Sequence, residues 1–256
     1  MAASGTQAID RAAELLSMVI LADEPRAFSD LVADTGLAKS TASRLLQALE
    51  RHRLVNKADE GYEAGPLFAI YASRHEPERE ITWLARPILE AVSRDTGETV
   101  NLAIVRNSAV VQIAQIDSTF LVGTTNWVDV DVPPHCSALG KVFFAAGAIA
   151  VPRTEMDRLT DRTVTDPAEL ERELEQVRRQ GYATALSELE IGLAAIAAPV
   201  HDRSGAVIAA IGISGPSDRI NKELRRLGKL LQAHARDLSV VLGHEFHDQT
   251  RKEGAA

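Results

Sequence analysis

The side chains best suited to contacting nucleic acid gather between Gly36 and Val55. In a helix, with about 100° between successive residues, the hydroxyl, amide and guanidinium groups of this stretch share one face. Such groups hydrogen-bond phosphates and base edges, so we interpret the stretch as a helix that contacts DNA. The candidate DNA-binding residues are Lys39, Ser40, Thr41, Ser43, Arg44, Gln47, Arg51 and Arg53.

The other face of this helix predicts packing on a small bundle. Its apolar stripe consists of Ala38, Ala42, Leu45, Leu46 and Leu49. An earlier helix, over residues 7–22, offers a second apolar face made of Ile9, Ala12, Ala13, Leu16, Val19 and Ile20. An amphipathic helix that buries its apolar stripe leaves its polar face in solvent. We therefore expect the candidate DNA-binding side chains to be exposed.

A short helix over 27–36 is predicted just before the DNA-contacting one. We expect Ser29 to cap its N-terminus, Leu31 and Val32 to point inward, and Gly36 to end it with a positive φ. A helix, a glycine-containing turn and a second amphipathic helix form the helix-turn-helix pattern.

Residues 54–65 alternate in polarity around Asp59, Glu60 and Gly61, which indicates a two-stranded hairpin. Three helices followed by such a hairpin make a winged helix-turn-helix. We place this DNA-binding domain at residues 5–66.

The rest of the chain mixes helical and strand periods, which predicts an α/β (α+β) domain of sandwich type. A linker helix over 67–80, broken by Pro77, should lead to this domain at 81–246, and the polar tail 247–256 should be disordered. The expected strands are 99–105, 110–117, 183–189, 194–200 and 207–214, the last two joined as an antiparallel pair by the turn at 202–205. The expected helices are 82–95, 138–146, 154–159, 167–180 and 221–243. The closing helix carries an apolar stripe of Leu224, Leu227, Leu231, Leu238 and Val241.

The net charge of −8 and the pI of about 5.4 are unusual for a protein that binds nucleic acid. Between residues 38 and 57, however, five cations stand against one anion, a local charge of +4. Because the Debye length at physiological salt is about 8 Å, a phosphate responds mainly to this local patch.

The composition also bounds the compartment. A single cysteine excludes an intramolecular disulfide and suits a reducing cytoplasm. No segment reaches the roughly 18 apolar residues that a membrane span needs, and the apolar run near the start lacks the basic leader of a signal peptide. We expect a soluble, cytoplasmic protein.

His135, Cys136 and Ser137 precede the predicted helix at 138–146. Ser137 suits an N-cap and the first-turn amides of a helix attract anions, which predicts the anion-binding end of a ligand pocket. The structural alternative is that Ser137 only caps the helix while Cys136 is a small buried hydrophobe. A thiol nucleophile with its base would instead make the chain a Cys136-dependent hydrolase. Adjacent side chains of an extended segment point apart, however, which argues against that pair.

The sequence predicts no metal or cofactor site. The histidines show no spacing typical of a closed zinc site, and ALGK (138–141) lacks the spacing of a phosphate-binding loop. We expect no catalytic residue either.

Residues 9–71 resemble the N-terminal domain of the IclR family of bacterial transcriptional regulators, whose helix-turn-helix motif is matched by TGLAKSTASRLLQALERHRLV (35–55). HCSALGK (135–141) and the segments 84–105 and 192–216 resemble the effector-binding domain of the same family. The resemblance covers nearly the whole chain in the right order. It implies a GAF-like effector-binding domain after the winged helix-turn-helix.

The resemblance also implies positions that line an effector pocket. These are Leu121, Thr124, Ala138, Leu139, Ala185, Leu193, Ala195, Gly212 and Ser214. We add Cys136 from the cap segment, and Trp127, which could stack on a ring or lie at a surface or dimer contact. Because Ala185, Ala195 and Gly212 stand where relatives can have polar side chains, the pocket is poor in charge. This favours a mostly apolar or aromatic monoacid over a dicarboxylate.

We therefore expect a homodimeric or homotetrameric, ligand-responsive transcription regulator that binds a near-palindromic operator. Two rival hypotheses remain at this point. One is the Cys136-dependent hydrolase with an appended helix-turn-helix. The other is an interaction module whose second domain only oligomerises.

Overall fold

A computed structural model of the chain describes residues 4–74, 77–120, 126, 128 and 132–244. The chain divides into two compact units, Met1–Pro77 and Glu78–Ala256. None of the helices in the described segments is long and apolar enough to cross a membrane.

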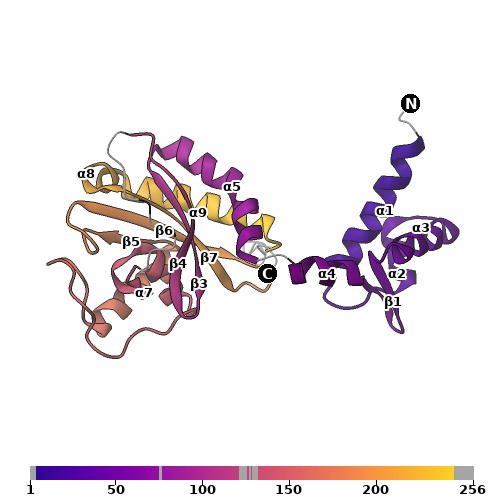
Figure 1. Cartoon of the computed structure of the whole chain (residues 1–256), viewed down its shortest axis with the longest axis horizontal. Helices are drawn as coiled ribbons and strands as arrows, with labels where there is room; N and C mark the ends of the chain where they lie inside the picture. Colours follow the sequence, from indigo (N-terminus) through magenta and orange to yellow (C-terminus); the bar gives the residue numbers. More distant parts are fainter. Residues whose placement is uncertain (1–3, 75–76, 121–125, 127, 129–131, 245–256) are drawn as a thin grey trace, which may run out of the picture. The chain divides into compact units, whose positions relative to one another are not determined.

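The first unit is a winged helix-turn-helix, as predicted (Figure 1). Its elements are α1 (Ser4–Ile20), α2 (Phe28–Thr35), α3 (Lys39–Arg51), β1 (Val55–Ala58), β2 (Gly61–Ala64) and α4 (Pro66–Arg74). Gly36 ends α2 with a φ of 62°, and β1 pairs antiparallel with β2. Buried Leu15, Leu31 and Leu46 join the three helices of the bundle in one core.

Three expectations for this unit were wrong in detail. Ser29 caps nothing, because α2 starts at Phe28 and its N-cap residue is Ala27; the Ser29 hydroxyl instead donates to Asp30 Oδ1 at 3.1 Å. Ala38 is exposed because it precedes α3 as its N-cap residue. The apolar face of α1 runs through Leu15 and Val19, which leaves Ala13 and Ile9 exposed, Ile9 to 69%.

The second unit is an α/β/α sandwich built on a five-stranded sheet of order β4-β3-β7-β6-β5, with every neighbouring pair antiparallel. The strands are β3 (Thr99–Arg106), β4 (Ala109–Ile116), β5 (Ala183–Leu186), β6 (Leu193–His201) and β7 (Val207–Pro216). The helices are α5 (Pro77–Thr96), α6 (Ala138–Ala145), α7 (Pro167–Gln180), α8 (Ser217–Ile220) and α9 (Leu224–Val241), with 3₁₀ turns η1 (Pro134–Cys136) and η2 (Asn221–Glu223).

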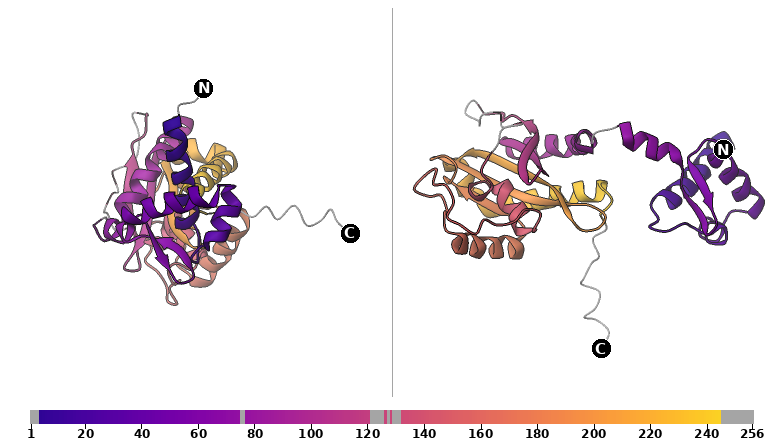
Figure 2. Two further views of the ribbon diagram at one scale, coloured as in Figure 1. Left: turned by 90° about the vertical axis from the view of Figure 1, so that its right-hand side faces the viewer. Right: turned by 60° about the horizontal axis from the view of Figure 1, so that its bottom comes forward.

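The two faces of the sheet carry side chains of different size. Helices α5 and α9 cover the face that bears Leu102, Ile196 and Ile211. Helices α6 and α7 cover the opposite face, whose buried strand residues include Ala197 and Ala210. Figure 1 shows α5 and the yellow α9 on one side of the sheet and α7 on the other, and the right-hand view of Figure 2 shows the salmon α7 outside the orange strands.

Helix α7 shows how local signals set an element in this unit. Asp166 accepts the N–H of Glu169 at 2.8 Å as a side-chain cap, Pro167 occupies the first helical position, and Gly181 ends the helix with a φ of 75°. The predicted bounds of this helix were correct.

Four other expectations for this unit were wrong. Residues 154–159 form no helix, because Met156 N–H bonds the carbonyl of Thr165 and draws the segment into an irregular loop. The helix expected at 82–95 starts earlier, at Pro77, since proline lacks only an N–H that the first turn leaves unused. The strand from Ala183 stops at Leu186, and Ser187 has a φ of 59°. The closing helix expected at 221–243 begins with the 3₁₀ turn η2 and continues as α9, which ends at Val241, and Val241 is 51% exposed.

Candidate DNA-binding helix and effector cavity

Helix α3 presents the candidate DNA-binding residues as one polar surface. Lys39, Ser40, Arg44, Gln47 and Arg51 are exposed. Thr41 and Ser43 are half-buried, and Arg53 is exposed just beyond the helix, with a φ of 60°. Ala42, Leu46 and Leu49 are buried on the reverse side, so the bundle holds this surface toward solvent.

The cations of α3 are available to an anionic partner. Among the ion pairs of the described residues, none involves Lys39, Arg44, Arg51 or Arg53. Such cations can neutralise phosphates without breaking an internal bond.

A cavity lies in the second unit, between the sheet and the N-terminal end of α6. It gathers side chains from elements that are far apart in the sequence. The sequence-predicted effector residues that line it are Cys136, Ala138, Leu139, Ala185, Leu193, Ala195, Gly212 and Ser214. Leu121, Thr124 and Trp127 lie outside the described residues.

Small residues on neighbouring strands create this space. Ala185 pairs with Ala195, and Ala195 pairs with Ser214, while Gly212 lies next on β7 at the same face. A Cβ atom added to Gly212 would lie 3.1 Å from Leu139 Cδ2, so the absence of a side chain there admits Leu139 of α6. The cavity therefore exists because these strand positions have no large side chains.

Sequence reasoning missed two polar residues of the cavity wall, Asn101 of β3 and Gln112 of β4. They are only 3% and 7% exposed. Asn101 Nδ2 donates to Ser214 Oγ at 3.0 Å. Their sequence signal is an amide flanked on both sides by apolar residues, as in VNLAI (100–104) and VVQIA (110–114).

Ser137 caps α6 as predicted, because its Oγ accepts the N–H of Gly140 at 2.9 Å. The first-turn amides of a helix have no partner within the helix, so this end of α6 can donate hydrogen bonds to a ligand. Ser137, Ala138 and Leu139 all line the cavity. Its described lining contains no charged side chain.

Cys136 and His135 do not form a nucleophile and base. Cys136 is fully buried, and its Sγ donates to the carbonyl of Pro133 at 3.3 Å. His135 Nε2 instead lies 2.8 Å from the carbonyl oxygen of Asp157. Burial, followed by the nearby carboxylate of Glu188, raises the pKa of the Cys136 thiol to about 11. Since the thiolate is the reactive form, this cysteine is a poor nucleophile near neutral pH.

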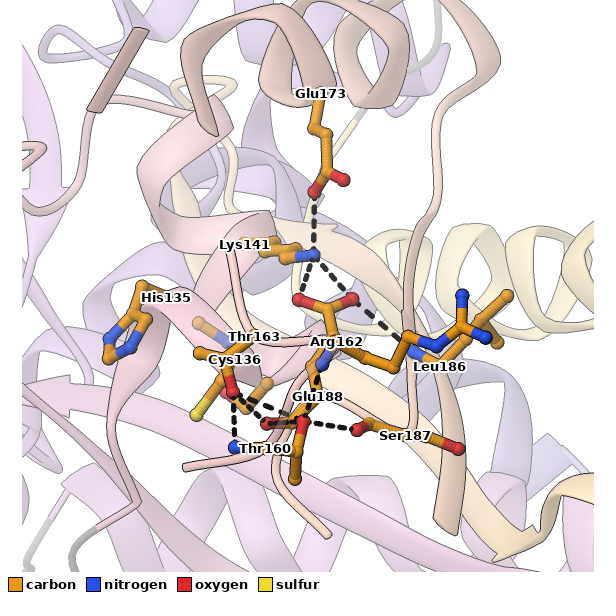
Figure 3. A network of polar contacts seen from close by, with 12 residues as sticks. His135, Cys136, Lys141, Thr160, Arg162, Thr163, Glu173, Leu186, Ser187 and Glu188 are labelled. Atoms are coloured by element: carbon orange, nitrogen blue, oxygen red, sulfur yellow. Dashed lines mark hydrogen bonds and ion pairs between the residues drawn. The ribbon is translucent and has the colours of Figure 1, made fainter. Parts of the chain in front are cut away.

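A buried ion pair ties α6 to the turn that follows β5 (Figure 3). Lys141 is 1% exposed, and its Nζ donates to both carboxylate oxygens of Glu188, at 2.8 and 2.7 Å, and to Glu173 Oε2 at 2.6 Å. Thr163 Oγ1 adds a bond of 2.7 Å to the backbone carbonyl of Glu188. Burial raises the pKa of Glu188, and the Lys141 ammonium opposes this rise. The ion pair holds Glu188 against α6 and so positions the next residue, Leu189, in the cavity lining.

No group of three or more His, Cys, Asp or Glu side chains in the described segments is placed to hold a metal ion.

Comparison with known proteins gives matches to both units. Residues 8–59 match the IclR helix-turn-helix domain, and residues 77–240 match the C-terminal domain of the bacterial transcriptional regulator IclR. The glycerol operon regulatory protein of Streptomyces coelicolor is 31% identical over 231 residues, which span 86% of this chain and 89% of that protein.

Two repressors are also similar over nearly the full length. The HTH-type transcriptional repressor AllR of Escherichia coli is 29% identical over 255 residues, covering 96% of this chain and 94% of AllR. The crystal structure of the Agrobacterium tumefaciens repressor BlcR superposes with a TM-score of 0.70 at 25% identity, covering 95% of this chain and all of that chain (100%).

Proposed function

The chain belongs to the IclR family of bacterial transcriptional regulators, and from this premise we propose how its two units work. The protein is a ligand-responsive, DNA-binding regulator of metabolic genes. We propose that α3 contacts the operator and that the cavity beneath α6 holds the effector.

The polar surface of α3 supports the DNA-binding half of the proposal. The N-terminal residues Lys39, Ser40, Thr41 and Ser43 would lie nearest the bases, with Arg44 and Gln47 on the same outward face. Arg51 and Arg53 would contact backbone phosphates. The wing tip, Asp59 and Glu60, is acidic and would approach the DNA only loosely. In a dimer or tetramer with twofold symmetry, two such helices require a near-palindromic operator with half-sites about one helical turn apart.

The cavity supports the effector half, and its composition is the observation that carries the proposed ligand class. Its mostly apolar lining with a few polar groups is typical of a site for a small organic molecule. The lining is mostly apolar, and in the described residues it offers no cation that could hold a second carboxylate. We propose a mostly apolar or aromatic monoacid whose carboxylate accepts hydrogen bonds from the first turn of α6.

Regulation requires that this ligand bind the DNA-competent and DNA-incompetent arrangements with different affinities. We propose that the protein acts in the cytoplasm as a repressor, the role that the names of AllR and BlcR give to those proteins. The proposal requires no cofactor.

A salt titration tests the DNA-binding half. Duplexes enriched from a random pool by repeated binding to the full chain serve as operator probes. The logarithm of the binding constant should fall with the logarithm of salt concentration, with a slope of about −0.9 per phosphate neutralised. A flat response would remove phosphate contact by α3 from the proposal.

Melting of the full chain with small monoacids tests the effector half. A ligand that binds only the folded protein raises the melting temperature. A shift together with ligand-dependent release of the operator excludes the interaction module, and recovery of the ligand unchanged after incubation excludes the hydrolase. The absence of any shift across a broad panel would favour the interaction module.

A further inference from the structure

Two carbonyl oxygens in the cavity wall lack a hydrogen-bond partner within the described chain. They are Asn101 Oδ1 and Gln112 Oε1. Both side chains are more than nine-tenths buried, and both line the cavity. Burying an amide oxygen without a partner is unfavourable, so two such atoms on residues that line one cavity indicate a partner from outside the described chain.

The sheet places these two amides close together. Gln112 of β4 pairs with Ala103 of β3, and Asn101 lies two residues from Ala103 on the same face of the sheet. Asn101 and Gln112 are thus diagonal neighbours across the register shift between Leu102 and Ala103, and both line the same cavity.

The amide of Asn101 is also held in one orientation. Its Nδ2 donates to Ser214 Oγ at 3.0 Å, which leaves Oδ1 on the other side of the amide group. An oxygen in this position can only accept a hydrogen bond. Its missing partner must therefore be a donor.

The cavity thus has two polar ends of opposite character. The first turn of α6 supplies N–H donors, which suit the carboxylate of the proposed effector. The wall formed by β3 and β4 supplies acceptors, which suit a hydroxyl or an N–H group. Alanine, leucine and glycine positions lie between them.

We infer that the effector carries, apart from its acid group, a hydroxyl or N–H donor that binds Asn101 Oδ1 and Gln112 Oε1. This inference rests on the proposed effector function of the cavity. It narrows the ligand class from an apolar monoacid to a hydroxy- or amino-substituted one. Gln112 and Asn101 then determine specificity, because an analogue without the donor would leave both oxygens buried and unpaired.

Matched ligands test the inference on the full chain by titration calorimetry. The probes are benzoate, its three monohydroxy derivatives and the corresponding methoxy derivatives, which keep the oxygen but lose the donor. At least one hydroxybenzoate should bind about tenfold or more tightly than benzoate, the difference expected for one buried hydrogen bond. Its methoxy counterpart should show no such gain.

Variants assign the gain to the proposed residues. Gln112→Met keeps the length of the side chain and removes its oxygen, so it should lower affinity for the preferred hydroxybenzoate and reduce or abolish the preference for this ligand over benzoate. Gln115→Met is the matched control on the same strand, since Gln115 donates to Asp117 Oδ1 and does not line the cavity. Far-ultraviolet circular dichroism and melting of each variant confirm that it folds.

The outcomes separate this inference from the function on which it rests. If benzoate binds as tightly as every hydroxy derivative, or if Gln112→Met keeps the preference, ordered water satisfies the two amides and the inference fails while the effector function stands. If no acid binds a chain that still binds its operator, the proposed effector class fails and the inference fails with it.

Discussion

The two candidate binding surfaces keep their polar groups in opposite environments. The cations and hydroxyls of α3 lie in solvent, on the side of a helix whose other side is packed. In the cavity, by contrast, Asn101 and Gln112 are buried, and the space exists because Ala185, Ala195 and Gly212 are small.

Substitutions on α3 should therefore affect binding without affecting stability, whereas substitutions in the cavity should affect both. An exposed side chain on α3 can be truncated with little effect on folding, since the surrounding water already solvates it. A residue that shapes the cavity packs in the core of its unit, so its substitution acts on ligand and fold together. The following predictions test this contrast.

The largest effect is expected at Lys141, whose buried ion pair with Glu188 holds the segment next to the cavity in place. Lys141→Met should lower the free energy of unfolding by about 3–5 kcal/mol, because it leaves the buried Glu188 carboxylate unpaired. The loss should shrink at low pH, where Glu188 takes up a proton and needs no cation. Urea denaturation measures both effects.

Two variants control for that result. Adding Glu188→Gln to Lys141→Met should recover most of the loss, since the amide needs no counter-charge. Lys222→Met, at an exposed lysine, should change stability by less than about 0.5 kcal/mol. A Lys141→Met protein as stable as the natural one would show that the ion pair does not brace the cavity.

The next effect concerns the thiol at the edge of the cavity. The folded pKa of Cys136 is about 11 and its ordinary value is 9.0, so below pH 9 the folded chain should carry about 100-fold less thiolate than the unfolded chain. Iodoacetamide should therefore label the folded protein slowly at pH 8 and faster as the pH rises through 11. The same protein in urea is the control, and because the sequence has one cysteine, the label reports this site alone. Equal labelling rates in both states at pH 8 would contradict the burial of this thiol.

On the exposed surface, Arg44→Ala should weaken operator binding by about 1–3 kcal/mol if Arg44 contacts a base. Its free energy of unfolding should stay within about 0.5 kcal/mol of the natural value. Fluorescence anisotropy and urea denaturation give the two quantities. Arg225→Ala, at an exposed arginine of the other unit, should change neither. A stability loss as large as the binding loss would erase the contrast between the two surfaces.

The smallest effect is expected at the cap of α6. Ser137→Ala should cost about 1 kcal/mol, because the N–H of Gly140 loses its acceptor. Ser29→Ala is the matched control and should cost almost nothing, since Ser29 lies inside α2 and caps no helix. Similar losses for the two variants would mean that the hydroxyl of Ser137 has no special role.

The contrast between the surfaces also explains what could be predicted from the sequence. The DNA-binding helix and α7 could be predicted because their signals lie in contiguous residues: a periodic apolar stripe, a proline or a cap, and a terminal glycine. The resemblance to the IclR family supplied cavity positions such as Ala195 and Gly212, which carry no chemical signal of their own.

The remaining features are products of tertiary structure. Asn101 and Ser214 are 113 positions apart, and only the pairing of β3 with β7 brings their side chains together. Lys141 reaches Glu188 across 47 positions because α6 packs on β5. The irregular loop around Met156 has helical periodicity, but the N–H of Met156 donates to the carbonyl of Thr165 instead of to a helical partner.

The two faces of the central sheet have different roles in the second unit. Leucines and isoleucines pack beneath α5 and α9, whereas alanines lie beneath α6, where we propose that the effector binds. Enlarging one of these alanines should change which ligand fits and, because the residue packs in the core of its unit, should also change stability. Substitutions at these few positions are therefore a route by which proteins of this fold come to bind different ligands.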